Sequence, residues 1–223
     1  MNVVAAQNLG ECWLKCVAQV LEQGELHYDE DVAIREILGL SVEIACPSSK
    51  DDFISRTGDQ KVIKKMLKKF SKGVVMEDRP FTYGQLIYDM NGIDQFEWII
   101  RRIRKKPETK SATISLISPG LEALNLPCLI ALDAKIRKGA LHLQFFFRSQ
   151  NIFGRQYANL LALAALHERL SLQSGYSIGS MKGYIASAHI YDFDLVYARE
   201  LIRTKKIQIT DYYYTKGPAS VRS

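Results

Sequence analysis

The segment CLIALDAKIRKGALHLQFFFRS, residues 128–149, decides the fold, because it holds two strand-like stretches around a tight turn. The stretches are 128–136 and 140–149, and the Lys138-Gly139 dipeptide between them is typical of a hairpin turn. The next stretch, 156–172, is hydrophobic on most sides of a helix, so it predicts a central buried helix. A hairpin followed by a buried helix indicates a sheet packed by helices.

Hydrophobic periodicity extends this pattern in both directions along the chain. It predicts helices over 8–23, 60–71, 94–106 and 194–204, and strands over 39–46, 112–118, 183–193 and 206–214. Strands and helices mix without strict alternation, so we expect an α+β fold with one large mixed β-sheet packed by helices. The chain is expected to form a single domain over residues 1–223.

The composition is that of a globular protein, with 223 residues, 47% hydrophobic and 24% charged. The sequence has no apolar run of about 20 residues and no signal-peptide pattern, so we expect a soluble cytoplasmic protein without a membrane partner. A net charge of +6 favours anionic partners, and nucleic acid, a nucleotide and an acidic protein all qualify. The basic stretches 61–69 and 101–106 have helical spacing, which indicates solvated faces of amphipathic helices.

The four cysteines are expected to be reduced in the cytoplasm. Cys12 and Cys16 lie four positions apart on the same side of a predicted helix. No second pair of Cys or His ligands follows, so we expect two small buried side chains and no metal site. Cys46 precedes Pro47 and has no evident chemistry. Cys128 is the cysteine whose surroundings indicate a reaction.

Cys128 and Arg148 together fit chemistry by an activated thiolate. A thiolate is a soft nucleophile, and one that adds to a conjugated ring makes the neighbouring ring carbon nucleophilic. A nearby arginine lowers a thiol pKa, and its planar fork suits a phosphate. The alternatives are a buried strand cysteine and a surface arginine at the end of a strand.

Three segments of the second half are similar to thymidylate synthases in order and spacing. They are Pro127-Cys128, Arg148-Ser149 twenty positions after the cysteine, and His189-Ile190-Tyr191. Asn159 also follows Asn151 by eight positions. The pieces FRSQNIFG and SAHIYDFD most closely resemble the shorter archaeal-type members of this superfamily, which also includes pyrimidine nucleotide hydroxymethylases. The first 80 residues resemble the family only loosely.

The resemblance assigns a role to each of these positions. Cys128 is the nucleophile, and Arg148 with Ser149 binds the 5′-phosphate. Asn159 pairs with N3 and O4 of uracil, where members that act on cytosine usually carry an acid. His189 and Tyr191, which share one strand face, hold the sugar 3′-hydroxyl. The alternatives are an asparagine at a helix N-terminus and a half-buried aromatic strand face.

Two upstream positions resemble the family less specifically. Tyr83-Gly84 is similar to the Tyr-Gly pair near the catalytic cysteine, so Tyr83 is a candidate catalytic residue. Arg35, in AIREILGL, resembles a mobile phosphate-binding arginine before the first strand. A surface arginine is the alternative for Arg35.

The sequence departs from the family where the folate and the proton relay are expected. Lys65 is nearest to the expected relay glutamate, and Asn151 replaces the aspartate that recognises the pterin ring. Further departures are Leu129, Phe147, Lys110-Ser111 and the tail KGPASVRS. The nucleotide half is largely intact, so the departures leave the carbon donor open.

These residues predict an enzyme that methylates dUMP to dTMP. The resemblance implies 5,10-methylene-tetrahydrofolate or a related pterin such as methylene-tetrahydromethanopterin as cofactor, and a homodimer packed through its sheets. The alternatives are a nucleotide 5-hydroxymethylase, another C5-modifying enzyme or a ribonucleotide substrate, and a non-catalytic nucleotide or RNA binder. The nucleophile-phosphate-sugar set argues against a nucleic acid partner, because a binder needs no cysteine at this spacing.

Overall fold

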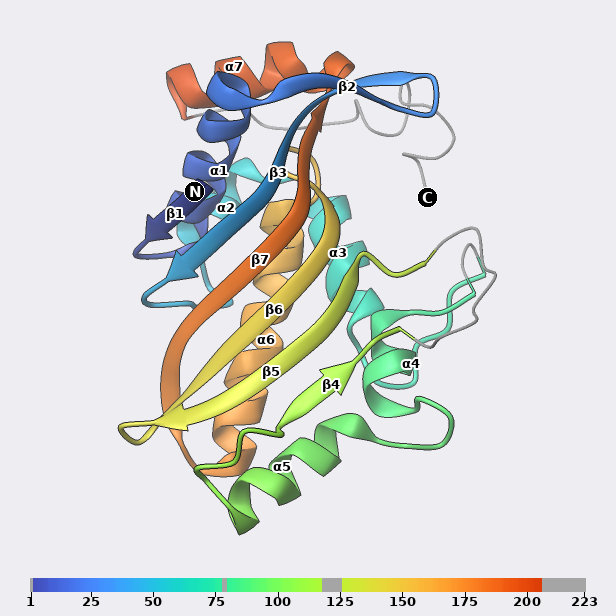
Figure 1. Ribbon diagram of the computed structural model, residues 1–223, viewed down its shortest axis with the longest axis vertical. Helices are drawn as coiled ribbons and strands as arrows, with labels where there is room; N and C mark the ends of the chain where they lie inside the picture. Colours follow the sequence, from blue (N-terminus) through green and yellow to red (C-terminus); the bar gives the residue numbers. More distant parts are fainter. Residues whose placement is uncertain (1, 78–79, 118–125, 206–223) are drawn as a thin grey trace.

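The computed structural model describes residues 2–77, 80–117 and 126–205. One seven-stranded sheet runs in the order β1-β3-β7-β6-β5-β4, and β2 pairs with β3 (Figure 1). The strands are β1 Asn2–Ala6, β2 Glu25–Asp29, β3 Val32–Ile44, β4 Thr113–Ser115, β5 Leu129–Arg137, β6 Ala140–Asn151 and β7 Ser177–Tyr191. The helices are α1 Leu9–Gln23, α2 Asp52–Thr57, α3 Gln60–Lys69, α4 Tyr83–Tyr88, α5 Gln95–Lys105, α6 Gln156–Ser174 and α7 Leu195–Thr204, with a 3-10 turn at Asp192–Asp194.

The sheet is mixed, as the sequence predicts. The pairs β1–β3 and β6–β7 are parallel, and the remaining pairs are antiparallel. Lys138 and Gly139 join β5 to β6 with φ angles of 51° and 75°, which is the backbone of a tight hairpin turn. The predicted hairpin and the expected α+β class are therefore confirmed.

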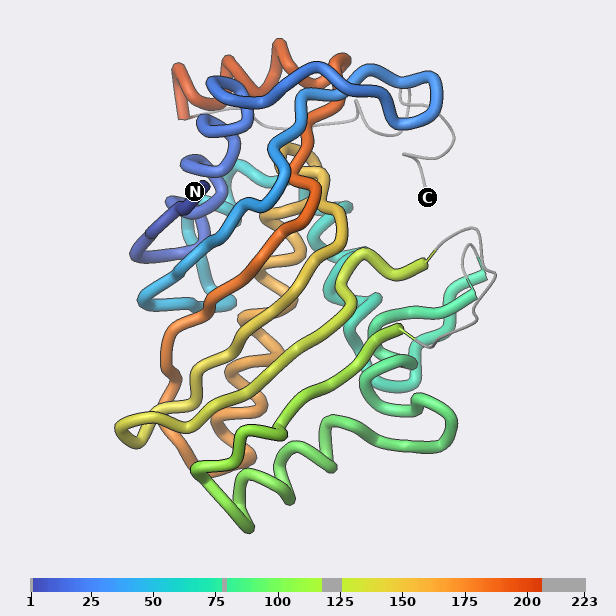
Figure 2. Tube along the Cα trace, in the orientation of Figure 1, coloured from blue at the N-terminus to red at the C-terminus, as the bar shows by residue number. Residues whose placement is uncertain are grey.

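Helices α1, α3 and α6 lie behind the sheet in the view of Figure 1, and Figure 2 shows the same layering along the Cα trace. Helix α6 is buried along most of its length, as predicted. Trp13 connects α1 to the segment that follows β6, because its indole donates a hydrogen bond to the Ile152 carbonyl at 3.0 Å. Its ring also packs on Tyr157 of α6, with 4.7 Å between the ring centroids. The start of α6 is thus fixed at the end of β6.

Cys12 and Cys16 are buried thiols on α1, as expected from their spacing. A hydrogen bond with Cys16, together with burial, raises the pKa of the Cys12 thiol well above its ordinary value. Cys12 therefore stays protonated, and both thiols contribute apolar volume to the core. Among the described helices, none is long and apolar enough to cross a membrane.

A glycine reverses the side-chain alternation of β3. Leu38 and Leu40 are two positions apart, so a regular strand would place both side chains on one face. Leu38 is instead 71% exposed, whereas Leu40 is fully buried. Gly39 lies between them with φ +73°, a conformation that L side chains rarely adopt. In the half of β3 before Gly39, the residues that face the core are therefore not those that a regularly alternating strand would place there.

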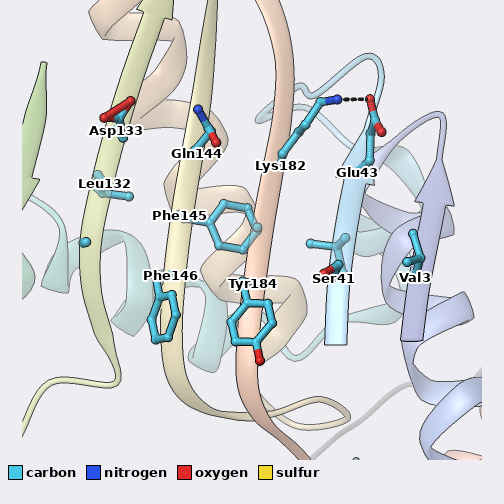
Figure 3. A pocket seen from close by; sticks show the side chains of 13 residues that line it. Val3, Ser41, Glu43, Leu132, Asp133, Gln144, Phe145, Phe146, Lys182 and Tyr184 are labelled. Carbon is cyan, nitrogen blue, oxygen red and sulfur yellow. Dashed lines mark ion pairs between the residues drawn. The ribbon is translucent and has the colours of Figure 1, made fainter. Parts of the chain in front are cut away.

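The face of the sheet toward the viewer in Figure 1 carries no described helix. Figure 3 shows an open depression there, where the rings of Phe146 and Tyr184 pack with centroids 5.2 Å apart and planes tilted by 31°. Val3 adds exposed apolar surface at its border, and Lys182 pairs with Glu43 at 2.7 Å. This depression contains none of the predicted site residues.

Several predicted boundaries were wrong. Strand β3 begins at Val32 rather than at residue 39, because the charged residues in VAIREIL obscure the apolar pattern. Arg35 therefore lies inside a strand and not before the first one. Strand β7 begins at Ser177 rather than at residue 183. The short elements β1, β2, α2 and α4 were not predicted. The predicted strand 206–214 lies outside the described residues.

Candidate active site

Arg148 holds the segment that carries Cys128. Its backbone N–H donates to the Cys128 carbonyl at 2.8 Å, which joins β6 to the residue just before β5. Its guanidinium donates to the Pro127 carbonyl from Nε at 3.1 Å and to the Leu126 carbonyl from Nη2 at 2.7 Å. A guanidinium has five N–H groups. These two hydrogen bonds use two of them and leave three for an anion. One arginine thus contacts three consecutive carbonyls and keeps donors for a ligand.

Tyr83 approaches the same segment from α4. Its hydroxyl accepts a hydrogen bond from the backbone N–H of Leu129 at 3.3 Å, directly after Cys128. A capping box between Thr82 and Gln85 fixes the start of this helix. A Cβ on the next residue, Gly84, would lie 2.0 Å from the Ser71 carbonyl oxygen, so a larger residue would push α4 away. The Tyr-Gly pair therefore lets Tyr83 reach the cysteine segment.

His189 and Tyr191 lie at the end of β7 beside Ser149 of β6. The Ser149 hydroxyl is 3.5 Å from Nδ1 of His189, and the two β7 rings pack edge to face at 5.2 Å. Burial lowers the pKa of His189, so its ring is neutral at pH 7. Burial and then the hydrogen bond to Asp29 raise the pKa of Tyr191, and the nearby Cys128 adds to this shift. Tyr191 and the Cys128 thiol are therefore electrostatic neighbours.

Asn159 carries a buried amide in the first turns of α6. Its side chain is only 6% exposed, and its Oδ1 has no hydrogen-bond partner within the described part of the chain. It does not cap the helix, because α6 has Arg155 as N-cap and no side-chain cap bond. An unpaired buried amide oxygen costs about 1–3 kcal/mol, which a donor on a ligand would recover.

Asn151 and Arg35 are placed differently from the other predicted residues. The Asn151 side-chain oxygen accepts from the Gly154 N–H at 2.8 Å and so shapes the turn into α6. Arg35 pairs in register with Ile190, whereas its neighbour Glu36 pairs with His189. Arg35 therefore faces away from His189, and its Nη1 is 3.4 Å from the Gly24 carbonyl at the end of α1. The structure does not bring Arg35 to Arg148.

Three polar residues near His189 were not predicted from the sequence. Ser187 donates to the carboxylate of Glu36, and its hydroxyl is 3.5 Å from Nδ1 of His189. Tyr191 donates to Asp29 Oδ2 at 2.7 Å. Ser187 could have been found, because it lies two positions before His189 on one strand and so shares its face. The two carboxylates have no such signal, since strand register alone brings them near.

The candidate residues gather at one end of the sheet, where β6 and β7 end and β5 begins (Figure 1). A thiol, a guanidinium with spare donors, a hydroxyl and a buried amide occur there with a neutral imidazole. This set can bind a phosphorylated ligand and offer it a nucleophile. It fits the expected pterin less well, because residue 151 is neutral and its amide oxygen is already bonded to Gly154.

The chain is similar to known proteins over most of its length. The thymidylate synthase family model matches residues 51–215, which is more than half of the chain. Curated archaeal relatives carry the name "Putative thymidylate synthase". The one from Methanosarcina acetivorans is 30% identical over 197 residues, covering 86% of this chain and 91% of the relative. The one from Methanothermobacter thermautotrophicus is 30% identical over 217 residues, covering 90% and 98%. The chain belongs to the thymidylate synthase family.

Proposed function

We propose that this chain transfers a one-carbon unit to C5 of a uracil nucleotide monophosphate, converting dUMP to dTMP through a thiolate adduct of Cys128 at C6. The observation that carries the proposal is the contact of Arg148 with the three carbonyls at residues 126–128. This contact ties the guanidinium to the segment that carries the thiol, where it would also reach the expected phosphate. A guanidinium in that position favours the thiolate over the thiol.

The nucleotide is held at three points. The spare N–H groups of Arg148 and the hydroxyl of Ser149 bind the 5′-phosphate with charge-assisted hydrogen bonds. The amide of Asn159 donates to O4 of the base and accepts from N3–H, which satisfies its unpaired oxygen. His189 and Tyr191 hold the sugar hydroxyl. Ring and thiol are thereby kept in one geometry, which lowers the entropic part of the barrier.

The reaction begins when the sulfur of Cys128 bonds to C6. The C5–C6 π electrons move toward O4, where the Asn159 amide stabilises the negative charge of the enolate. C5 then forms the new carbon–carbon bond with the one-carbon unit. Once the C5 proton is lost, the bond between the one-carbon unit and the donor nitrogen would break and leave an exocyclic methylene at C5. Hydride addition to that carbon, which the pterin would supply, expels the thiolate from C6 and restores the ring double bond. Tyr83 is the candidate acceptor for the C5 proton, because its hydroxyl lies beside the amide that follows Cys128.

The carbon donor in this proposal is a methylene-tetrahydropterin, either the folate or the methanopterin form, which supplies the carbon and a hydride. Asn151 offers no charged partner to the pterin edge, so the choice of pterin rests on other residues. A hydroxymethylase, which adds water in place of hydride, is the alternative. The amide of Asn159, rather than an acid, favours a uracil substrate in either case.

Activity is tested by tritium release from 5-tritiated dUMP with each pterin, followed by product mass. We expect pterin-dependent release and a product of the mass of dTMP, whereas a hydroxymethylated product would establish the alternative. Cys128→Ser should abolish release, and Cys46→Ser, which removes an exposed thiol, is the matched control. A Cys128→Ser protein with full activity would refute the mechanism. RNA mobility shift without tritium release would favour a binder.

We further propose that two copies pack through the helix-free sheet face of Figure 3. Phe146 and Tyr184 provide apolar surface there, and Leu38 and Val3 are exposed hydrophobic residues. Light scattering of the purified chain should give a dimer mass. Tyr184→Glu should yield monomers, because two copies of this charge would be buried without partners. Tyr197→Glu, at a half-exposed tyrosine on α7, is the control. A Tyr184→Glu dimer of unchanged stability would contradict this interface.

A further inference from the structure

A polar chain crosses from β3 to β7 beside the proposed sugar site. Glu36 pairs in register with His189, and Ser187 follows on the same face of β7. The Ser187 hydroxyl donates to the Glu36 carboxylate. The same oxygen lies 3.5 Å from Nδ1 of His189, as does the hydroxyl of Ser149.

Counting protons fixes the direction of these bonds. A serine hydroxyl has one hydrogen, and an ionised carboxylate only accepts. The hydrogen of Ser187 therefore goes to Glu36, and the Ser187 oxygen can interact with Nδ1 of His189 only as an acceptor. When Ser149 donates to a bound phosphate, its oxygen also faces Nδ1 as an acceptor. Nδ1 must then carry the hydrogen.

The other ring nitrogen of His189 is left as an acceptor. Burial lowers the pKa of His189, which keeps the ring neutral and limits it to one hydrogen. With that hydrogen on Nδ1, Nε2 presents a lone pair. Within the described part of the chain, the side-chain hydrogen-bond contacts of the ring are those of Nδ1, and none involves Nε2.

The hydroxyl of Tyr191 is also left as a hydrogen-bond acceptor, because a different carboxylate takes its hydrogen. Its hydroxyl hydrogen goes to Asp29 Oδ2 at 2.7 Å, so its oxygen is also left to accept. The ring of Phe193 stacks on Tyr191 at 5.2 Å with only 6° between the planes, which restricts its rotation. Asp29 is the last residue of β2 and reaches Tyr191 through the β2–β3 hairpin.

We propose that Glu36 and Asp29 are positioning residues that hold His189 and Tyr191 as hydrogen-bond acceptors, so that the site requires a hydroxyl donor on the sugar. The proposal rests on the function proposed above for this site. A nucleotide within a polynucleotide has an esterified 3′-oxygen without a hydrogen, and its phosphate would approach two carboxylates. The arrangement therefore selects free nucleoside monophosphates and rejects nucleic acid.

The proton arrangement is testable on the full chain in saturating inorganic phosphate, which engages the Ser149 hydroxyl as the nucleotide phosphate would. Nitrogen-15 NMR of labelled histidines distinguishes the two neutral tautomers, and a His189→Gln variant identifies the signal among the four histidines. We expect hydrogen on Nδ1 of His189. Glu36→Ala should move it toward Nε2, because the Ser187 hydroxyl is then released to donate to Nδ1. Glu36→Gln, whose amide can donate to Ser187, should act in the same direction if the alanine variant does not fold.

The control for charge is Glu25→Ala, an exposed glutamate that pairs with Glu36 across β2 and β3. It should leave the tautomer unchanged. Hydrogen on Nε2 in the parent chain would overturn the proposal, as would an unchanged tautomer in both Glu36 variants.

The selectivity is tested by the affinities for 5-fluoro-dUMP and for its 3′-deoxy analogue. The parent should bind the hydroxylated form about tenfold more tightly or better, the usual loss when a ligand leaves buried polar groups unpaired. In Glu36→Ala and Asp29→Asn the ratio should fall toward about threefold or less. Asp31→Asn, at an exposed aspartate of the same hairpin, should keep the parent ratio. Equal parent affinities would overturn this proposal and leave the proposed function intact. Failure of the parent to bind either nucleotide would refute the function, while the tautomer would still decide the proton arrangement.

Discussion

Replacing Arg148 by lysine removes the planar, forked guanidinium group and keeps the positive charge. The fork now contacts two consecutive carbonyls, Leu126 at 2.7 Å and Pro127 at 3.1 Å, and keeps three N–H groups for phosphate. A lysine ammonium is one compact donor group on a flexible chain. It can replace one carbonyl contact or bind phosphate, but not both in the geometry of the guanidinium.

The expected loss follows from these contacts. Arg148 is exposed, so each hydrogen bond to a carbonyl contributes roughly 1 kcal/mol after solvent screening. Losing one such contact and one of two phosphate bonds amounts to about 2–3 kcal/mol, or roughly 30- to 150-fold in affinity. Because the Cys128 segment is also released, the rate of adduct formation should fall at least as much.

Calorimetry of 5-fluoro-dUMP binding measures the loss of affinity, and the time course of adduct formation measures the loss of rate. Arg137→Lys is the matched control, because Arg137 ends β5 at the opposite end of the sheet. That variant should bind like the parent. An Arg148→Lys protein whose affinity stays within threefold of the parent would refute the role assigned to the fork.

Three further perturbations follow from the structure. Asn159→Asp should weaken dUMP binding at least tenfold, because a carboxylate repels O4. Measured affinities for dUMP and dCMP check this prediction. An unchanged affinity for dUMP would contradict the base assignment. Gly84→Ala should lower the free energy of unfolding by about 1–3 kcal/mol and slow catalysis, because the added Cβ would lie 2.0 Å from the Ser71 carbonyl oxygen. If a urea titration gives the variant the same stability as the parent, this clash is excluded. Burial lowers the pKa of His167 and His189 below 6.5, so the unfolded chain binds protons first as pH falls. Stability should be full above pH 6.5 and decline as the pH drops below it, less steeply in His167→Gln; a flat urea-midpoint profile from pH 7.5 to 5.5 would contradict this.

The elements that could be predicted are those whose residues give an unambiguous local signal. Helix α6 is apolar on nearly all sides, and the Lys138-Gly139 turn has the backbone that its residues favour. Strand β2 could not be predicted, because all five of its residues are exposed and it relies on pairing with β3. Arg35 was misplaced for a related reason, since its strand gains order from β2 and β7 on either side.

Sequence spacing located most of the candidate site but not the groups that orient it. Arg148 lies twenty positions from Cys128, and the hairpin makes them neighbours through a 2.8 Å backbone bond. The carboxylates of Glu36 and Asp29 are 151 and 162 positions from the hydroxyls that they accept from. Long-range register of this kind leaves no local pattern in a single sequence.

The central claim is that the sulfur at position 128 bonds to a bound uracil base. Intact mass spectrometry after incubation with 5-fluoro-dUMP and each pterin, followed by peptide mapping, measures this directly. We predict a single added mass of nucleotide plus pterin on the peptide that contains Cys128, and none in Cys128→Ser. Tight nucleotide binding with an unmodified Cys128, or an adduct on any other residue, would contradict the account.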